Sequence, residues 1–177
     1  MYKRQDIPCK NYTHQTKYTL PIPPSPNLPN MKAVYLYPAT CYFEATPVSL
    51  GRGTSLPFQV YGHPNMTGYD YSFTPKSVPG AKNPPQLNKL CHGVNLSNMS
   101  DEEIWKRGVD LSYVIDAYKN LNIGDHFFRP FFELLVGTDY VRKMIIEGKS
   151  AEEIKNRWKG DVEKFKEQRK PYLLYQE

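Results

Sequence analysis

The chain has 177 residues, 40% of them hydrophobic and 14% aromatic, which is enough to bury the core of one globular domain and excludes a disordered chain. Its formal net charge of +5 does not indicate a nucleic-acid-binding protein, because Lys and Arg are scattered and alternate with Glu and Asp over residues 138–177. Two interpretations of the charge stay open: a basic surface without a partner, or a modest field that attracts an anionic glycan.

The opening residues, Met1 to Gln5, resemble the translation of a sequencing adapter. We expect them not to belong to the natural protein and leave them out of the fold prediction; the alternative is a short natural N-terminus. Beyond them the first half of the chain is rich in proline, since only Pro130 and Pro171 of the 16 prolines lie beyond residue 85. Proline lacks an N–H and disrupts helix interiors, so this half is expected to consist largely of turns and irregular extended segments.

Within the first half, the apolar pattern predicts a helix from Asn30 to Tyr42 that is interrupted near Pro38. Three short strands are predicted, at residues 58–61, 71–74 and 92–97. In the third strand, Val94 and Leu96 are expected on one face.

The second half has helical periodicity. One helix is predicted around Leu111, Val114, Tyr118 and Leu121. Thr138 is predicted to cap a second helix that runs through Glu147 and ends at Gly148, and Ser150 and Glu153 form a capping box for the last helix. The inner face of that last helix is predicted to carry Ile154, Trp158, Val162 and Phe165.

Together these elements predict an α+β fold with a small mixed β-sheet, an irregular proline-rich N-terminal half and a helical C-terminal half. The helices are expected to be structural and to cover the sheet. The aromatic side chains are expected mostly in the core, with some available to contact the apolar face of a sugar.

The segment Tyr37 to Pro64 is the best candidate for a functional site. It places one carboxylate, Glu44, after an apolar run, and one arginine, Arg52, between Gly51 and Gly53. Glycine lets the backbone turn tightly and approach a ligand. The arginine side chain offers a planar fork of donors that suits a carboxylate or a phosphate.

Seven motifs run in order along nearly the whole chain and resemble the C-terminal half of the exo-β-N-acetylmuramidases, which are bacterial glycoside hydrolases of peptidoglycan recycling. The motifs are PSPNLPN (24–30), FEAT (43–46), SLGRGTSLPFQVYGHP (49–64), FTPKSVPGAKNPP (73–85), CHGVNL (91–96), FELLVGTD (132–139) and PYLLY (171–175). The resemblance implies hydrolysis of terminal N-acetylmuramic acid from peptidoglycan fragments.

The same resemblance implies that residues 6–177 are one domain of a two-domain protein. The family's other domain is N-terminal and Rossmann-like, carries the proposed catalytic acid and has no counterpart in this sequence. This chain is then expected to be a fragment that supplies the C-terminal half of the active-site cleft, with the missing domain as its partner. Family members are periplasmic or secreted, but the compartment of this chain stays open.

Glycoside hydrolysis normally uses two carboxyl groups, or the substrate's own acetamido group in place of one. Glu44 is the one carboxylate in a suitable sequence context, while Asp70 and Asp125 lack supporting spacing. Two roles are open for Glu44: it assists catalysis or fixes substrate hydroxyls, or it only forms a salt bridge with Arg52.

N-acetylmuramic acid differs from N-acetylglucosamine by a lactyl ether that carries a carboxylate. Arg52 is the candidate to bind that carboxylate, and the alternative is that it orders its loop through backbone carbonyls. Further candidate substrate-binding residues are Asn27, Ser49, Thr54 and His63, with His92 as a weaker one. Asn27 has the alternative of shaping the proline-rich loop, and each histidine that of a structural role.

Other classes of function receive less support. A non-catalytic carbohydrate-binding or accessory domain is the main alternative to an enzyme. A serine hydrolase using Ser49 is excluded by the absence of a G-x-S-x-G motif. The three cysteines, Cys9, Cys41 and Cys91, form no CxxC pair and no metal spacing with histidine, so we expect no metal, no cofactor and no disulfide framework. No stretch approaches the roughly 20 apolar residues that span a bilayer.

Overall fold

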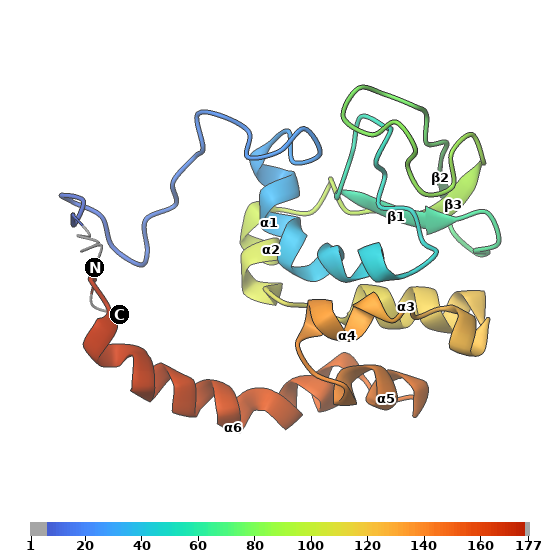
Figure 1. Cartoon of the computed structure of the whole chain (residues 1–177). Coiled ribbons are helices and arrows are strands. Elements are labelled where there is room, and N and C mark those ends of the chain that lie inside the picture. Colours follow the sequence, from blue (N-terminus) through green and yellow to red (C-terminus); the bar gives the residue numbers. More distant parts are fainter. Residues whose placement is uncertain (1–6, 176–177) are drawn as a thin grey trace, which may run out of the picture. The chain divides into compact units, whose positions relative to one another are not determined.

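The computed structural model describes residues 7–175 (Figure 1), and the adapter prediction for Met1 to Gln5 lies outside them. The chain forms two compact units, which are described separately. The larger unit runs from Leu20 to Ile154. The smaller one combines the segment up to Thr19 with the segment from Lys155 onward.

A three-stranded sheet lies in the larger unit (Figure 1). Its strands are β1 (Val60–His63), β2 (Tyr71–Phe73) and β3 (Cys91–Asn95), in the order β1-β3-β2. Both pairings are antiparallel. The predicted α+β class is therefore confirmed, but the sheet is antiparallel where a mixed sheet was expected.

The edge strand β1 meets the central strand β3 at a pair of glycines. Gly62 of β1 lies opposite Gly93 of β3. A Cβ atom on Gly93 would collide with the carbonyl oxygen of Tyr61, and one on Gly62 with the carbonyl oxygen of His92. These two glycines therefore allow the strand backbones to approach closely.

The predicted strand bounds shift by one or two residues for local reasons. The first strand begins at Val60 because Phe58 has a φ of 58°, a left-handed conformation that ends the preceding turn. The third strand ends at Asn95, whose side-chain oxygen accepts a hydrogen bond from the Ser97 backbone N–H at 2.9 Å. Leu96 is buried just beyond that strand, so it does not share a strand face with Val94 as predicted.

The first helix, α1 (Met31–Thr40), begins where the sequence predicted. The Asn30 side chain caps it by accepting a hydrogen bond from the Ala33 N–H at 2.9 Å. Pro38 lies inside the helix, so the predicted interruption there is wrong: one missing N–H is tolerated, and the helix continues to Thr40. The chain then tightens into the 3₁₀-helix η1 (Cys41–Ala45).

The second half is helical, as predicted. It contains α2 (Asp101–Arg107), α3 (Ser112–Leu121), η2 (Gly124–His126), α4 (Phe131–Val136), α5 (Tyr140–Ile146), α6 (Ala151–Arg169) and η3 (Lys170–Tyr172). The helices α3, α5 and α6 correspond to predicted ones. The short helices α2 and α4 were not predicted.

The two predicted helix starts in this half have different outcomes. At α6, Ser150 and Glu153 form the capping box, with Glu153 N–H to Ser150 Oγ at 3.2 Å and Ser150 N–H to Glu153 Oε2 at 2.8 Å. At α5 the predicted cap by Thr138 is wrong, because Asp139 occupies the N-cap position. The Thr138 hydroxyl is buried without a hydrogen-bond partner among the described residues.

Stacked aromatic rings form much of the core of the larger unit. Phe43 of η1 stacks on Tyr61 of β1 with ring centroids 4.8 Å apart, and Tyr61 contacts Tyr113 of α3 at 5.9 Å. A second group consists of Tyr42, Tyr118, Phe127, Phe128 and Phe132. The contact between Tyr42 and Phe132 packs η1 against α4, and η1 is the segment that carries Glu44.

In the smaller unit, Tyr175 joins the two segments of chain. Its hydroxyl accepts a hydrogen bond from the Cys9 N–H at 2.7 Å, and its ring lies 5.0 Å from that of Tyr12. The predicted inner face of α6 is wrong in this unit, because Val162 and Phe165 are 42% and 58% exposed and the described residues do not cover them. Only Ile154, at the start of α6, is fully buried, and it belongs to the larger unit.

Candidate functional site

Glu44 and Arg52 meet in the larger unit. Glu44 lies on η1 and Arg52 on the loop before β1. Nη2 of Arg52 donates a hydrogen bond to Oε1 of Glu44 at 2.5 Å. The salt bridge that was one of the two roles open for Glu44 is therefore present.

The loop that holds Arg52 depends on its two glycines. Gly51 and Gly53 have φ values of 72° and 82°, which side chains rarely adopt. A Cβ atom on Gly53 would also collide with the Lys76 carbonyl oxygen, and one on Gly51 would lie 2.7 Å from the Leu56 carbonyl oxygen. The two glycines thus allow the tight turn and the close backbone packing that position the Arg52 guanidinium next to Glu44.

Two aromatic rings extend the site beside this ion pair. The Arg52 guanidinium carbon lies 5.3 Å from the centre of the Phe58 ring, within cation–π range. The Phe58 ring in turn contacts that of Tyr37, with centroids 5.3 Å apart. Burial raises the pKa of Tyr37, and the Glu44 carboxylate raises it further. The Tyr37 hydroxyl therefore stays protonated at neutral pH and is available as a hydrogen-bond donor.

Tyr37, Glu44 and Arg52 line an open cleft with a volume of about 570 Å³. The lining side chains are Tyr37, Phe43, Glu44, Val48, Leu50, Arg52, Asn83, Pro85, Arg129, Phe131 and Leu135. Two arginines and one glutamate leave the cleft with one net positive charge. Such a cleft accommodates a small molecule with an apolar face and an anionic group.

Of the predicted site residues, the structure brings only Glu44 and Arg52 into the lining of this cleft. The Ser49 side chain is fully buried, and its oxygen accepts a hydrogen bond from the Gly51 N–H at 3.3 Å. The Thr54 hydroxyl donates to the Gly51 carbonyl at 2.7 Å. Both hydroxyls are therefore engaged in building the loop around Arg52.

Asn27 and His63 lie outside the cleft lining as well. The Asn27 amide nitrogen donates to the Gly80 carbonyl at 3.0 Å, a contact that fits its loop-shaping alternative. His63 Nδ1 accepts a hydrogen bond from the Asn65 N–H at 3.1 Å. Burial lowers the pKa of His63, and the nearby Lys89 lowers it further. His92 pairs across the strands with His63 and shares a hydrogen bond with Ser72 at 2.9 Å.

Arg129 is the cleft residue that sequence reasoning missed. It lies in the aromatic run from Phe127 to Phe132, which has the composition of a core segment, so nothing in the local sequence indicated an exposed cation at a cleft. Arg129 is exposed, and its backbone N–H donates to the Ala45 carbonyl at 2.9 Å. This long-range bond joins it to the end of η1, next to Glu44.

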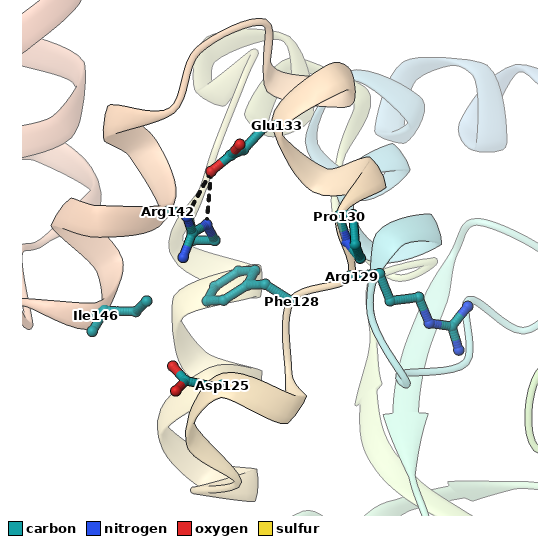
Figure 2. A pocket seen from close by; sticks show the side chains of 7 residues that line it. All are labelled: Asp125, Phe128, Arg129, Pro130, Glu133, Arg142 and Ile146. Atoms are coloured by element: carbon teal, nitrogen blue, oxygen red, sulfur yellow. Dashed lines mark hydrogen bonds and ion pairs between the residues drawn. The ribbon is translucent and has the colours of Figure 1, made fainter.

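Arg129 also lines a second, smaller hollow of about 340 Å³ (Figure 2). Within it, Oε1 of Glu133 accepts a hydrogen bond from Nε of Arg142 at 2.9 Å and lies 2.7 Å from Nη2 in an ion pair. Figure 2 shows the side chain of Arg129 extending away from Phe128 and Arg142. The charge of Arg142 is thus neutralised locally, while the guanidinium of Arg129 is directed elsewhere.

The three cysteines are free thiols, and two of them, Cys41 and Cys91, lie in buried surroundings. Burial raises the pKa of both Cys41 and Cys91 to about 11, so their thiols stay protonated at neutral pH. Residues 7–175 contain no group of three or more metal-ligating side chains placed to hold an ion. No helix among them has the length and apolar character to cross a membrane.

Comparison with known proteins places this domain in a family of peptidoglycan-directed glycoside hydrolases. The chain belongs to the exo-β-N-acetylmuramidase NamZ C-terminal family, whose model matches residues 35–175. It is 34% identical over 167 residues to the peptidoglycan β-N-acetylmuramidase NamZ of Bacillus subtilis (strain 168), a match that covers 86% of this chain and 40% of that protein.

Two solved structures, both of DUF1343 family proteins from Bacteroides fragilis NCTC 9343, have similar folds. One is 83% identical with a TM-score of 0.95, over 97% of this chain and 48% of that one. The other is 20% identical with a TM-score of 0.62, over 88% of this chain and 45% of that one, and shows a shared fold alone. The chain thus spans less than half the length of each of these relatives.

Proposed function

We propose that this chain is the C-terminal part of an exo-β-N-acetylmuramidase that releases terminal N-acetylmuramic acid from peptidoglycan fragments. The cleft that Glu44, Arg52 and Arg129 line is its contribution to the active site. The observation that carries the proposal is the combination of one net positive charge and aromatic walls in a single cleft. Membership of the family and the peptidoglycan-directed activity named for the Bacillus subtilis relative support it.

The chemistry of the cleft matches N-acetylmuramic acid in two respects. The lactyl carboxylate of this sugar requires a cationic donor, and arginine supplies a planar fork of N–H groups for it. The pyranose ring has an apolar face, and the rings of Tyr37 and Phe131, 38% and 50% exposed, offer apolar surface at the cleft. A neutral N-acetylglucosamine residue would satisfy only the second requirement.

Hydrolysis of the glycosidic bond normally needs two carboxyl groups that flank it. Glu44 is the one carboxylate that lines the cleft among the described residues, and it is engaged by Arg52. We therefore propose that the catalytic acid comes from a Rossmann-like N-terminal domain outside this chain. In this account Glu44 holds Arg52 in place and is within the cleft to orient substrate hydroxyls.

A carbohydrate-binding accessory domain is the second candidate, and the engagement of Glu44 in an ion pair favours it. The two functions are separated by incubating the full product of the gene with the disaccharide N-acetylmuramyl-β-1,4-N-acetylglucosamine. The proposed enzyme releases free N-acetylmuramic acid. An accessory domain binds the disaccharide and leaves it intact, and that result would reject the proposed hydrolase.

A further inference from the structure

The arginines near the cleft differ in how their charge is compensated. Arg52 donates to Glu44 at 2.5 Å and lies over the Phe58 ring, so its charge is already partnered. Arg142, in the neighbouring hollow, makes a two-point contact with Glu133. Arg129 is exposed, lines the cleft and forms no ion pair with any of residues 7–175.

The backbone of Arg129 is nevertheless held firmly. Its N–H bonds to the Ala45 carbonyl at 2.9 Å, and its carbonyl accepts from the Phe132 N–H at 2.9 Å. Phe128 on one side packs on Phe132 with centroids 4.6 Å apart, and Pro130 on the other side has a fixed φ. The side chain therefore projects from an anchored position, which lowers the entropy lost when a ligand binds it.

We infer that Arg129 is the residue that binds the lactyl carboxylate of N-acetylmuramic acid, while Arg52, which Glu44 already occupies, acts as a positioning residue. The inference rests on the proposed function, because it names the carboxylate receptor of the proposed substrate. An open guanidinium forms a two-point, charge-assisted contact with a carboxylate. The same contact by Arg52 would bring the ligand carboxylate next to the Glu44 carboxylate, whose charge Arg52 already neutralises through Nη2.

Equilibrium binding tests this assignment without relying on hydrolysis. The full product of the gene is titrated with N-acetylmuramic acid and, separately, with N-acetylglucosamine, which lacks the carboxylate. We expect Arg129→Ala to weaken binding of N-acetylmuramic acid by about 10- to 100-fold and to leave binding of N-acetylglucosamine unchanged. Arg129→Lys keeps the charge but not the planar fork, so it should recover only part of the loss.

Arg107→Ala is the matched control, because Arg107 is a surface arginine on α2 whose ion pairs with Glu103 and Asp110 lie outside the cleft. It should bind both sugars as the unchanged protein does. Equal weakening of both sugars by Arg129→Ala, or no weakening of either, would overturn the assignment. Failure of the disaccharide cleavage described above rejects the hydrolase alone, since carboxylate-dependent binding through Arg129 is measured separately.

Discussion

The carboxylate of Glu44 accepts a hydrogen bond from Nη2 of Arg52 at 2.5 Å, and both side chains are partly exposed to the same cleft. Each residue thereby controls the charge that the other presents to a ligand. Removal of one partner does not simply delete a contact, because it leaves the other charge uncompensated. Because of this coupling, we expect a single substitution of Arg52 to weaken ligand binding and the additional substitution of Glu44 to restore part of it.

Arg52→Ala is predicted to weaken binding of N-acetylmuramic acid by about 1.5 to 3 kcal/mol, because the freed Glu44 carboxylate then repels the lactyl carboxylate. Adding Glu44→Gln should restore much of the loss, since it removes that repulsion. The measurement is a double-mutant cycle of binding constants. If the double variant binds as weakly as Arg52→Ala, then Arg52 contacts the carboxylate directly, which is the role that the sequence alone suggested.

Glu44→Gln by itself is predicted to lower turnover more than it lowers stability. A partly exposed ion pair contributes about 0 to 1 kcal/mol to folding, so the melting temperature should change little. Loss of the carboxylate, by contrast, removes the group that orients Arg52 and the substrate hydroxyls. Turnover and thermal unfolding are measured on the same preparation. Unchanged turnover with a lowered melting temperature would make Glu44 a salt-bridge residue only.

Asn30→Ala is predicted to destabilise the larger unit by about 1 kcal/mol, because it removes the side-chain cap of the helix that carries Tyr37. Asn30→Asp keeps an acceptor at the same position and should lose much less. Urea unfolding of both variants checks the prediction. Equal losses in the two variants would show that the cap itself contributes nothing.

Stability is predicted to rise with pH across the titration of His63. Burial and Lys89 lower the pKa of the folded imidazole, so the unfolded state binds more protons between the two pKa values. Stability therefore increases through this window and levels off above the unfolded value of about 6.5. Protonation at Nδ1 would also break the bond from the Asn65 N–H.

Melting temperatures between about pH 5 and about pH 7.5 test this dependence, with His63→Gln expected to flatten part of the rise. A slope that His63→Gln leaves unchanged would assign the pH dependence to other groups.

The sequence predicted those features that short-range signals determine. The start of the first helix at Asn30, the Ser150–Glu153 capping box and the tight turn at the glycines around Arg52 depend on signals within a few residues, and each is found as predicted. Local signals were misleading at Thr138. Threonine often caps helices, but Asp139 occupies the N-cap position of α5.

Features that depend on distant contacts were not predictable in this way. Arg129 reaches the cleft because its backbone bonds to Ala45, far away in the sequence, and because the nearby Phe127 and Phe132 are buried. The exposure of Val162 and Phe165 likewise depends on which segments cover α6 and not on the periodicity of the helix itself. In both cases the residue pattern predicts which side chains lie together on one surface, but not which distant segment packs against that surface.

The most direct test of the central claim compares the 177-residue chain with the full product of its gene on a chromogenic N-acetylmuramic acid glycoside. The cleft contributes one carboxylate where the usual mechanism calls for two, so we predict turnover by the full product and none by the chain alone. Turnover by the chain alone, abolished by Glu44→Gln, would contradict the account and make Glu44 the catalytic acid.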